Sequence, residues 1–255
     1  MKNITSKDNP VYKNALRLLR KKYRDQEGKY LIEGVKPLTD ACNAGIEVEM
    51  IFVREDSDAG IITDSQSNVS MLSGDLFDRL SETEASQGLI AVARKNRSEA
   101  GDGIIIVLDR LQDPGNIGTI IRTAEAAGFA AVMTVKGTAD VYSSKVVRAA
   151  AGSLFRMNII ECLKTDEAVR LCRERKCSII VTALEGAVNC FEADLTHAAI
   201  VIGNEGSGVS REFLAAADKK VKIPMKGEIE SLNAAVAAGL IMYESARQEA
   251  AGKVK

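Results

Sequence analysis

The chain has 255 residues, 46% hydrophobic and 27% charged, which is long enough to bury one or two hydrophobic cores without disulfide or metal support. The formal net charge of −1 excludes a uniformly basic nucleic-acid-binding protein, although residues 1–36 hold ten basic and only four acidic residues. With 4% aromatic residues and one histidine, His197, the composition disfavours single-strand binding by base stacking, a histidine-based zinc site and a serine–histidine–aspartate triad.

The first predicted element is a helix from Pro10 to about Tyr23, where apolar residues recur at helical spacing. Lys13, Arg17, Arg20 and Arg24 lie together on a neighbouring face of that helix. Two interpretations fit this basic stripe. It is either a solvated helix face or a surface that contacts RNA phosphates.

Residues 24–95 are predicted to complete a small α/β domain. A polar segment with two glycines follows and is predicted to be a linker over residues 96–103. The predicted domains are therefore 1–95 and 104–255. The elements predicted before the linker are strands over Tyr30–Glu33, Met50–Arg54 and Gly88–Ala93 and a helix over Pro37–Ala44 that Gly45 ends.

From residue 104 onward, short β-branched runs alternate with helical patterns, which predicts a parallel sheet covered by helices and hence an α/β fold. The predicted strands are Ile104–Leu108, Ala131–Val135, Asn158–Ile160, Ser178–Ala183, Ala198–Ile202 and Val221–Ile223. The predicted helices are Ile117–Ala127, Ser144–Ala150, Asp166–Lys176, Arg211–Ala217 and Leu232–Arg247.

The five cysteines are scattered and form no C-x-x-C pair, which is typical of reduced thiols in a cytoplasmic protein. The first fourteen residues are polar, and the longest apolar stretches fall well short of a membrane span. We therefore expect a cytoplasmic protein without a targeting or membrane segment. The acidic residues do not cluster at metal-ligand spacing, so no metal is expected.

Three loops follow predicted strands at the edge where open α/β sheets bind ligands. The first is Leu108-Asp109-Arg110-Leu111-Gln112-Asp113-Pro114-Gly115-Asn116-Ile117-Gly118. Asn116 stands where a helix N-cap is expected, so it is either a cap or a functional side chain. Arg122 points away from the apolar stripe of the following helix and is either a surface arginine or a functional one.

The second loop, residues 201–210, has three glycines in six residues, which allows a ligand to approach the backbone closely. Its spacing matches neither the dinucleotide-binding G-x-G-x-x-G nor the phosphate-binding G-K-[ST] pattern. The third loop, residues 223–233, brings Ser231 and Asn233 to the start of an alanine-rich helix, where polar ligand groups bind well.

Together these loops read D-P-G-N-I-G-x-I-x-R-T-A-x-A-x-G, I-G-N-E-G-x-G and I-P-M-x-G-x-x-x-S-L-N-x-x-V-A. In that order they resemble the three signature motifs of the SpoU (TrmH-type) RNA 2′-O-ribose methyltransferases. Residues 144–156 resemble the region between the motifs, except that Ala149–Ala151 stand where relatives often carry a serine. Asn9-Pro10, residues 21–24, Glu33-Gly34 and Gln87-Gly88 resemble the ribosomal-protein-like substrate-binding domain of the rRNA members.

The resemblance implies a homodimer whose C-terminal parallel-sheet domain is tied into a deep trefoil knot that binds S-adenosylmethionine. It implies catalytic roles for Asn116, Arg122, Glu205, Ser231 and Asn233. It also implies RNA binding by the basic stripe and by Arg148. The cofactor-binding residues that it implies are Ala183, Leu184, Ile202, Gly203, Glu205, Gly206, Ile223, Met225, Leu232 and Asn233.

The expected activity is S-adenosylmethionine-dependent 2′-O-methylation of a ribose in RNA, with 23S rRNA favoured over tRNA because of the two-domain layout. Since a guanidinium normally stays protonated, we favour Arg122 as a group that orients the hydroxyl and stabilises its developing negative charge, with a general-base role left open. The alternatives are tRNA ribose methylation, base methylation, and a non-catalytic RNA-binding or ribosome-assembly protein with the same fold.

Overall fold

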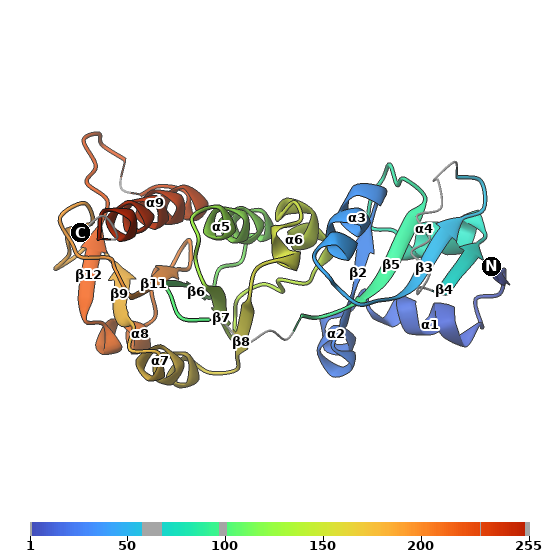
Figure 1. Cartoon of the computed structure of the whole chain (residues 1–255), viewed down its shortest axis with the longest axis horizontal. Helices are drawn as coiled ribbons and strands as arrows, with labels where there is room; N and C mark the ends of the chain where they lie inside the picture. Colours follow the sequence, from blue (N-terminus) through green and yellow to red (C-terminus); the bar gives the residue numbers. More distant parts are fainter. Residues whose placement is uncertain (1, 58–67, 97–100, 230, 253–255) are drawn as a thin grey trace. The chain divides into compact units, whose positions relative to one another are not determined.

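The computed structural model describes residues 2–57, 68–96, 101–229 and 231–252 (Figure 1). The chain forms two compact units, each with its own sheet and core. Unit 1 takes the residues up to 96 together with 140–155, and unit 2 takes 97–139 and everything from 156 onward. The predicted second domain, 104–255, thus gives up residues 140–155 to unit 1. Part of the predicted linker, residues 97–100, lies outside the described residues.

Unit 1 is built on a mixed five-stranded sheet with the order β1-β4-β3-β5-β2. The pairs β1–β4 and β4–β3 are parallel, whereas β3–β5 and β5–β2 are antiparallel. The strands are β1 (Lys2–Ile4), β2 (Lys29–Glu33), β3 (Val48–Arg54), β4 (Asn68–Leu72) and β5 (Leu89–Arg94).

Helices cover both faces of this sheet. One core joins buried residues of α1 (Pro10–Arg17) and α4 (Gly74–Leu80) to Phe52 and Leu72, while α3 (Val35–Asn43) buries Leu38 elsewhere. The sequence analysis missed β1, β4 and α4. These elements are short, with three, five and seven residues.

The single helix predicted over Pro10–Tyr23 is wrong, because the chain forms α1 and a second helix, α2 (Lys21–Glu27). Arg20 is extended at φ −105° and ψ 129°, which interrupts the helix. The guanidinium of Arg24 donates to the Leu18 carbonyl oxygen at 2.6 Å. In an unbroken helix that carbonyl would accept from the residue four positions later, so the arginine takes the place of a helical hydrogen bond.

Residues 140–155, which include α6 (Ser144–Ala149) and a short 3-10 turn at Ser153–Phe155, pack on unit 1. Asp140 pairs with the buried Arg24, and the ring of Tyr142 lies 5.0 Å from that of Tyr30. The Ser144 hydroxyl donates to the Glu82 carboxylate. These contacts explain why the segment folds with the first unit, although its sequence belongs to the α/β alternation of the second.

Unit 2 has a seven-stranded sheet in the order β10-β12-β9-β11-β6-β7-β8, in which each neighbouring pair is parallel. Its central strands are buried on both faces, as continuous β-branched runs predict. The strands are β6 (Ile105–Asp109), β7 (Ala131–Val135), β8 (Ile159–Cys162), β9 (Ser178–Thr182), β10 (Val188–Asn189), β11 (Ala198–Gly203) and β12 (Lys219–Lys222).

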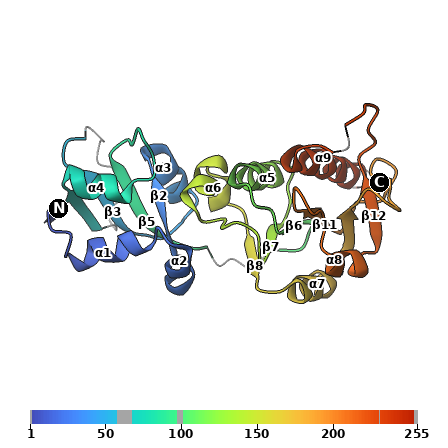
Figure 2. The same ribbon diagram turned by 180° about the vertical axis from the view of Figure 1, so that it is seen from behind.

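The helices of unit 2 cover the two faces of its sheet. Helices α5 (Pro114–Ala126) and α9 (Ala234–Gly252) lie side by side on one face, and α7 (Thr165–Glu174) and α8 (Arg211–Ala216) lie on the other (Figures 1 and 2). The core of the second face joins Ile105 and Val107 to Phe213 and Cys172. The parallel-sheet α/β prediction is confirmed, while the knot stays a prediction.

Among the helices that the structure describes, none is both long and apolar enough to cross a membrane.

Candidate active site

The three sequence motifs meet at the carboxyl edge of the unit 2 sheet. Strands β12, β9, β11 and β6 are parallel and adjacent in the order given, so the loops that follow them emerge on the same side. The first motif follows β6, the second follows β11, and the third lies between β12 and α9. Side chains far apart in the chain are thereby brought within hydrogen-bonding distance.

The N-cap of α5 is Asp113, so the expectation that Asn116 is the cap is wrong. Asp113 accepts from the backbone N–H of Asn116 at 2.7 Å, and Pro114 occupies the first helical position. Both features are typical of helix starts and were present in the sequence. With the cap supplied by Asp113, the Asn116 side chain is available for other partners.

Glu205 is the centre of the site. Its carboxylate accepts from the Asn116 side-chain amide at 3.2 Å and from the backbone N–H groups of Gln112 and Asp113 at 3.2 and 3.4 Å. The side-chain amide of Asn204 lies 3.4 Å from the same carboxylate. Within the described residues, these donors are all uncharged N–H groups, so Glu205 keeps its negative charge without a salt bridge.

These donors also act on the acidity of Glu205. Partial burial raises the pKa of its carboxyl group, but hydrogen bonds from Asn116 and from backbone amides outweigh burial. The pKa therefore lies below the ordinary range of a glutamate, and the group is ionised at neutral pH.

Asn233 links the third motif to the first two. Its side-chain amide donates to Oδ1 of Asn116 at 2.9 Å, while its own Oδ1 accepts from the backbone N–H groups of Ala235 and Val236 at 2.9 and 3.3 Å. Asn233 thus caps α9, which starts two residues later than predicted. A continuous chain of hydrogen bonds runs from the start of α9 through Asn116 to Glu205.

The loop after β11 folds back on itself. A Cβ atom at Gly203 would lie 2.3 Å from the Val209 backbone nitrogen, so only glycine fits there. The backbones of Asn204 and Gly208 pair in both directions at 3.1 and 2.9 Å, with Gly208 at φ +67°. Packing within the loop therefore requires glycine at residue 203, while the close approach of a ligand to this loop stays a prediction.

The predicted cofactor-binding residues lie along the same edge. Besides Glu205 and Asn233, described above, they are apolar or glycine residues at strand ends or in the loops that follow. Together they offer apolar surface and backbone groups of the kind that an adenosine and an amino-acid chain require. The Leu184 side chain is 71% exposed directly after β9, although it is large and apolar. Such surface fits the predicted S-adenosylmethionine. The residues are Ala183 and Leu184 after β9, Ile202 and Gly203 at the end of β11, Gly206 in its loop, and Ile223, Met225 and Leu232 between β12 and α9.

Two family models match the chain. The SpoU rRNA Methylase family model matches residues 103–243, and the MRM3-like substrate binding domain matches residues 9–91. The chain belongs to the SpoU rRNA methylase family. The family resemblance derived from the motifs is therefore confirmed.

Relatives match over nearly the whole chain. The 23S rRNA (guanosine(2553)-2′-O)-methyltransferase RlmP of Bacillus subtilis is 34% identical and covers 95% of this chain and 98% of its own. The 23S rRNA (uridine(2479)-2′-O)-methyltransferase of Streptomyces viridochromogenes is 30% identical, with 90% and 86% covered. The solved structure of the SpoU methyltransferase AviRb from that organism, in complex with AdoMet, superposes with a TM-score of 0.87 at 29% identity, with 95% and 98% covered.

Two of the expected SpoU catalytic residues lie outside the hydrogen-bonded chain. Arg122 is exposed on α5, and Ser231 is exposed just before α9. In the part of the chain that the structure describes, no hydrogen bond or ion pair joins either side chain to Glu205, Asn116 or Asn233. The structure thus brings together three of the five predicted catalytic residues.

The basic stripe of this SpoU protein is divided between exposed and buried residues. Lys13 is exposed and pairs with Asp8 at 2.7 Å. The Arg17 guanidinium lies 4.2 Å from the ring centre of Tyr23, and Arg20 is exposed between α1 and α2. Lys13, Arg17 and Arg20 therefore remain accessible to a phosphate.

Arg24 is removed from this stripe by the structure. Its side chain is 8% exposed and forms an ion pair with Asp140, so its charge is neutralised inside unit 1. The helix pattern missed this because the partner is 116 residues away. Arg148 on α6 is half-buried, and its Nη1 atom has no hydrogen-bond partner among the residues that the structure describes.

Sequence reasoning missed the polar residues that hold the second loop, chiefly Asn204 and Arg110. Asn204 lies in the second motif, but the family resemblance assigns roles to its neighbours Gly203 and Glu205 and not to Asn204. Arg110 belongs to no sequence pattern that indicates a function.

Within the described residues, no cluster of three or more His, Cys, Asp or Glu side chains has the geometry of a metal site. None of the five cysteines, which all lie within the described residues, forms a disulfide, and burial raises the pKa of Cys162 to about 11 and of Cys172 to about 12.

Proposed function

We propose that this protein transfers the methyl group of S-adenosylmethionine to a ribose 2′-hydroxyl of 23S rRNA. The observation that carries the proposal is the hydrogen-bonded chain of Glu205, Asn116 and Asn233, because it joins one residue from each SpoU motif in a single site. The matched relatives from Bacillus subtilis and Streptomyces viridochromogenes are 23S rRNA 2′-O-methyltransferases. The matched AviRb structure holds AdoMet.

When bound, S-adenosylmethionine supplies an electrophilic methyl group. Within this chain, Glu205 fixes the Asn116 amide, and Asn116 in turn fixes Asn233 at the start of α9. This arrangement holds the loop backbones in place before reaction, and positioning of this kind contributes several kcal/mol to catalysis. The backbone groups and apolar side chains at the ends of β9, β11 and β12 hold the cofactor.

Arg122 orients the ribose hydroxyl and stabilises the negative charge that develops on its oxygen. Its exposure on α5 supports this assignment, because an RNA chain can reach the guanidinium. A guanidinium remains protonated in proteins, so electrostatic stabilisation fits its chemistry better than proton abstraction. Ser231, exposed before α9, contacts the substrate from the third motif.

The proposed RNA-binding surface of unit 1 consists of Lys13, Arg17 and Arg20, with Arg148 on α6. These residues belong to one unit, which the MRM3-like substrate binding domain matches over residues 9–91. A 23S rRNA substrate and five cysteines outside any disulfide support action in the cytoplasm.

The proposed assembly is a homodimer through α9. Val236, Leu240 and Tyr243 are 52%, 41% and 56% exposed, and their spacing of four and three residues places them on one helix face. A large apolar stripe of this kind on a surface helix is typical of a protein–protein interface.

The test is methylation of unmodified 23S rRNA transcript and of unmodified tRNA, each with labelled S-adenosylmethionine. A 2′-O-methyl group protects the adjacent phosphodiester from alkaline cleavage, so mapping of alkali-resistant positions identifies the ribose. We expect one resistant position in 23S rRNA and none in tRNA, and Glu205→Gln is expected to reduce the rate.

Each other result contradicts a defined part of the proposal. Methylated tRNA with unmodified 23S rRNA would overturn the substrate. A labelled but alkali-sensitive product would indicate methylation of a base. If calorimetry showed no binding of S-adenosylmethionine by the intact protein, the non-catalytic RNA-binding alternative would replace the enzyme.

A further inference from the structure

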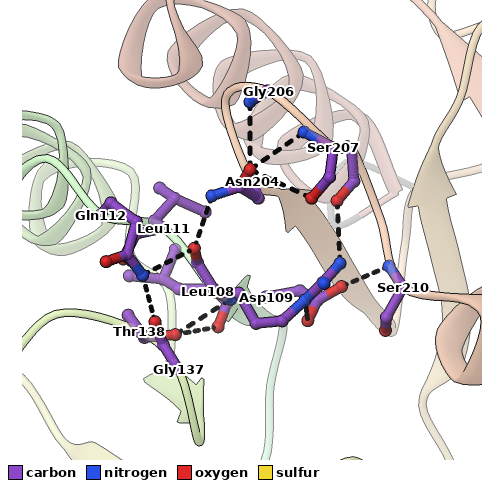
Figure 3. A network of polar contacts seen from close by, with 12 residues as sticks. Leu108, Asp109, Leu111, Gln112, Gly137, Thr138, Asn204, Gly206, Ser207 and Ser210 are labelled. Carbon is purple, nitrogen blue, oxygen red and sulfur yellow. Dashed lines mark hydrogen bonds and ion pairs between the residues drawn. The ribbon is translucent and has the colours of Figure 1, made fainter.

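A ring of polar contacts connects the end of β6 with the loop that carries Glu205 (Figure 3). Asn204 makes contacts in two directions. Its Oδ1 atom accepts from the backbone N–H groups of Gly206 and Ser207 at 3.0 and 2.9 Å and from the Ser207 hydroxyl at 3.1 Å. Its Nδ2 atom donates to the Arg110 carbonyl oxygen at 2.9 Å and lies 3.4 Å from the Glu205 carboxylate.

The acceptor for Asn204 is itself held in an unusual conformation. Arg110 has φ +62°, in the left-handed region that non-glycine residues rarely adopt. Its N–H donates to the Thr138 hydroxyl at 3.1 Å, and that hydroxyl donates to the Leu108 carbonyl oxygen at 2.8 Å. Its guanidinium donates to the buried Asp109 at 3.1 Å and to the Gly208 carbonyl oxygen at 3.3 Å. These contacts hold both the backbone and the side chain of Arg110, and they thereby fix the direction of its carbonyl.

We propose that Asn204 is a positioning residue that holds the Glu205 carboxylate toward Asn116, with Arg110 as its anchor. The orientation of the Asn204 amide is determined on both sides, since one atom must accept three hydrogen bonds and the other must donate. The donating atom faces Oε2 of Glu205, which also accepts from the backbone N–H of Gln112. This inference rests on the proposed role of Glu205.

Asn204→Asp tests the inference because aspartate has nearly the same shape as asparagine. The retained oxygen still accepts from Gly206 and Ser207, so the loop keeps these hydrogen bonds. The second oxygen, however, faces the Arg110 carbonyl and the Glu205 carboxylate and repels both. We expect kcat/KM for methylation of the RNA transcript to fall about 10–100-fold, the loss typical of a hydrogen bond to a charged group.

Asn189→Asp is the matched control. Oδ1 of Asn189 accepts from the Phe191 N–H at 3.1 Å, and its Nδ2 donates to the Glu192 carboxylate at 3.1 Å, so the same chemistry is repeated outside the proposed site. We expect this variant to keep the wild-type kcat/KM and to have a thermal midpoint close to that of Asn204→Asp.

A double-mutant cycle with Glu205→Gln separates positioning from loop folding. The neutral amide at 205 is not repelled by Asp at 204, so Asn204→Asp should cost much less in the Glu205→Gln background. An equal fold-loss in both backgrounds would show a role in loop folding only and would overturn the inference. If Asn204→Asp lowers the thermal midpoint, Asn204→Ala replaces it in the cycle, where a coupling of at least about twofold supports positioning and none overturns it.

The cycle also tells the two proposals apart. Full activity of Glu205→Gln would overturn the role of Glu205 and the inference with it. An impaired Glu205→Gln together with a fully active Asn204→Asp would overturn the inference alone.

Discussion

The buried ion pair of Arg24 and Asp140 allows a quantitative prediction for the stability of unit 1. The two side chains are 8% and 7% exposed, and the guanidinium contacts the carboxylate at 2.5 and 2.7 Å and the Leu18 carbonyl at 2.6 Å. Arg24→Ala leaves the buried carboxylate of Asp140 without its counter-charge. Removal of one member of a buried ion pair costs about 3–5 kcal/mol of unfolding free energy.

The assay is urea unfolding of the full chain, followed by the buried tyrosines Tyr12 and Tyr30 of unit 1. With a denaturant slope of about 2 kcal/mol per molar urea, the loss lowers the unfolding midpoint of unit 1 by about 1.5–2.5 M. Replacement of both partners, as in Arg24→Met with Asp140→Leu, should restore much of the loss because no buried charge is left unpaired.

The same double variant tests whether Arg24 contacts RNA. Each phosphate contact contributes about 0.7–0.9 to the slope of log K against log salt concentration. Arg20→Gln, on the exposed part of the stripe, should reduce the slope by about this amount, whereas Arg24→Met with Asp140→Leu should leave it unchanged. A slope reduced equally by both variants would refute the assignment of Arg24 to the interior.

Three further outcomes are expected. Arg110→Gly should unfold at a higher urea concentration than Arg110→Ala by the equivalent of about 0.5–1 kcal/mol, because the left-handed penalty of alanine exceeds the added chain entropy of glycine; equal midpoints would contradict strain at φ +62°. Hydrogen bonds from Arg173, partly opposed by burial, lower the pKa of Asp218, so the ionised carboxylate stabilises the fold above its unfolded pKa of about 3.9 and this contribution is lost as the pH falls through the lower folded value. The gap in unfolding free energy between the wild type and Asp218→Asn should accordingly be constant from pH 6 to 8 and should narrow below about pH 4, and a gap independent of pH would contradict this. Leu240→Glu should shift the sedimentation coefficient from that of a dimer to that of a monomer, and an unchanged value would exclude the α9 stripe as the interface.

The parallel sheet could be predicted well from the sequence because its strands are buried on both faces. A continuous β-branched run such as Ile104–Leu108 fits few structures other than a buried strand, and each strand predicted from residue 104 onward overlaps an observed strand. The observed ends of the helices and strands differ from the predicted ones by a few residues. Helix ends in particular depend on capping residues. Asp113 with Pro114 was a readable start signal for α5, whereas Asn233 as a cap required knowledge of where α9 begins.

Unit 1 was predicted less well because tertiary contacts override its local patterns. The helical period continues from Pro10 to Tyr23, yet α1 ends at Arg17, the backbone at Arg20 is extended, and the buried Arg24 binds the Leu18 carbonyl. The partner of Arg24, Asp140, lies in a segment whose sequence pattern belongs to the other unit. No local rule connects two residues at that separation, so the stripe was read as uniformly exposed.

The candidate site shows a different limit of sequence reasoning. The resemblance identified Asn116, Glu205 and Asn233, but it did not show that they hydrogen-bond to one another across separations of 89 and 117 residues. Each contact also has a direction. The carboxylate at 205 can only accept, so it turns the nitrogen of Asn116 toward itself and the oxygen toward Asn233. That oxygen requires a donor, so it turns the nitrogen of Asn233 inward and leaves the oxygen of Asn233 to cap α9. The charge on Glu205 therefore determines how the side-chain amides of Asn116 and Asn233 are oriented and how α9 is capped. This dependence follows from the chain of hydrogen bonds across the three motifs, and no single motif shows it.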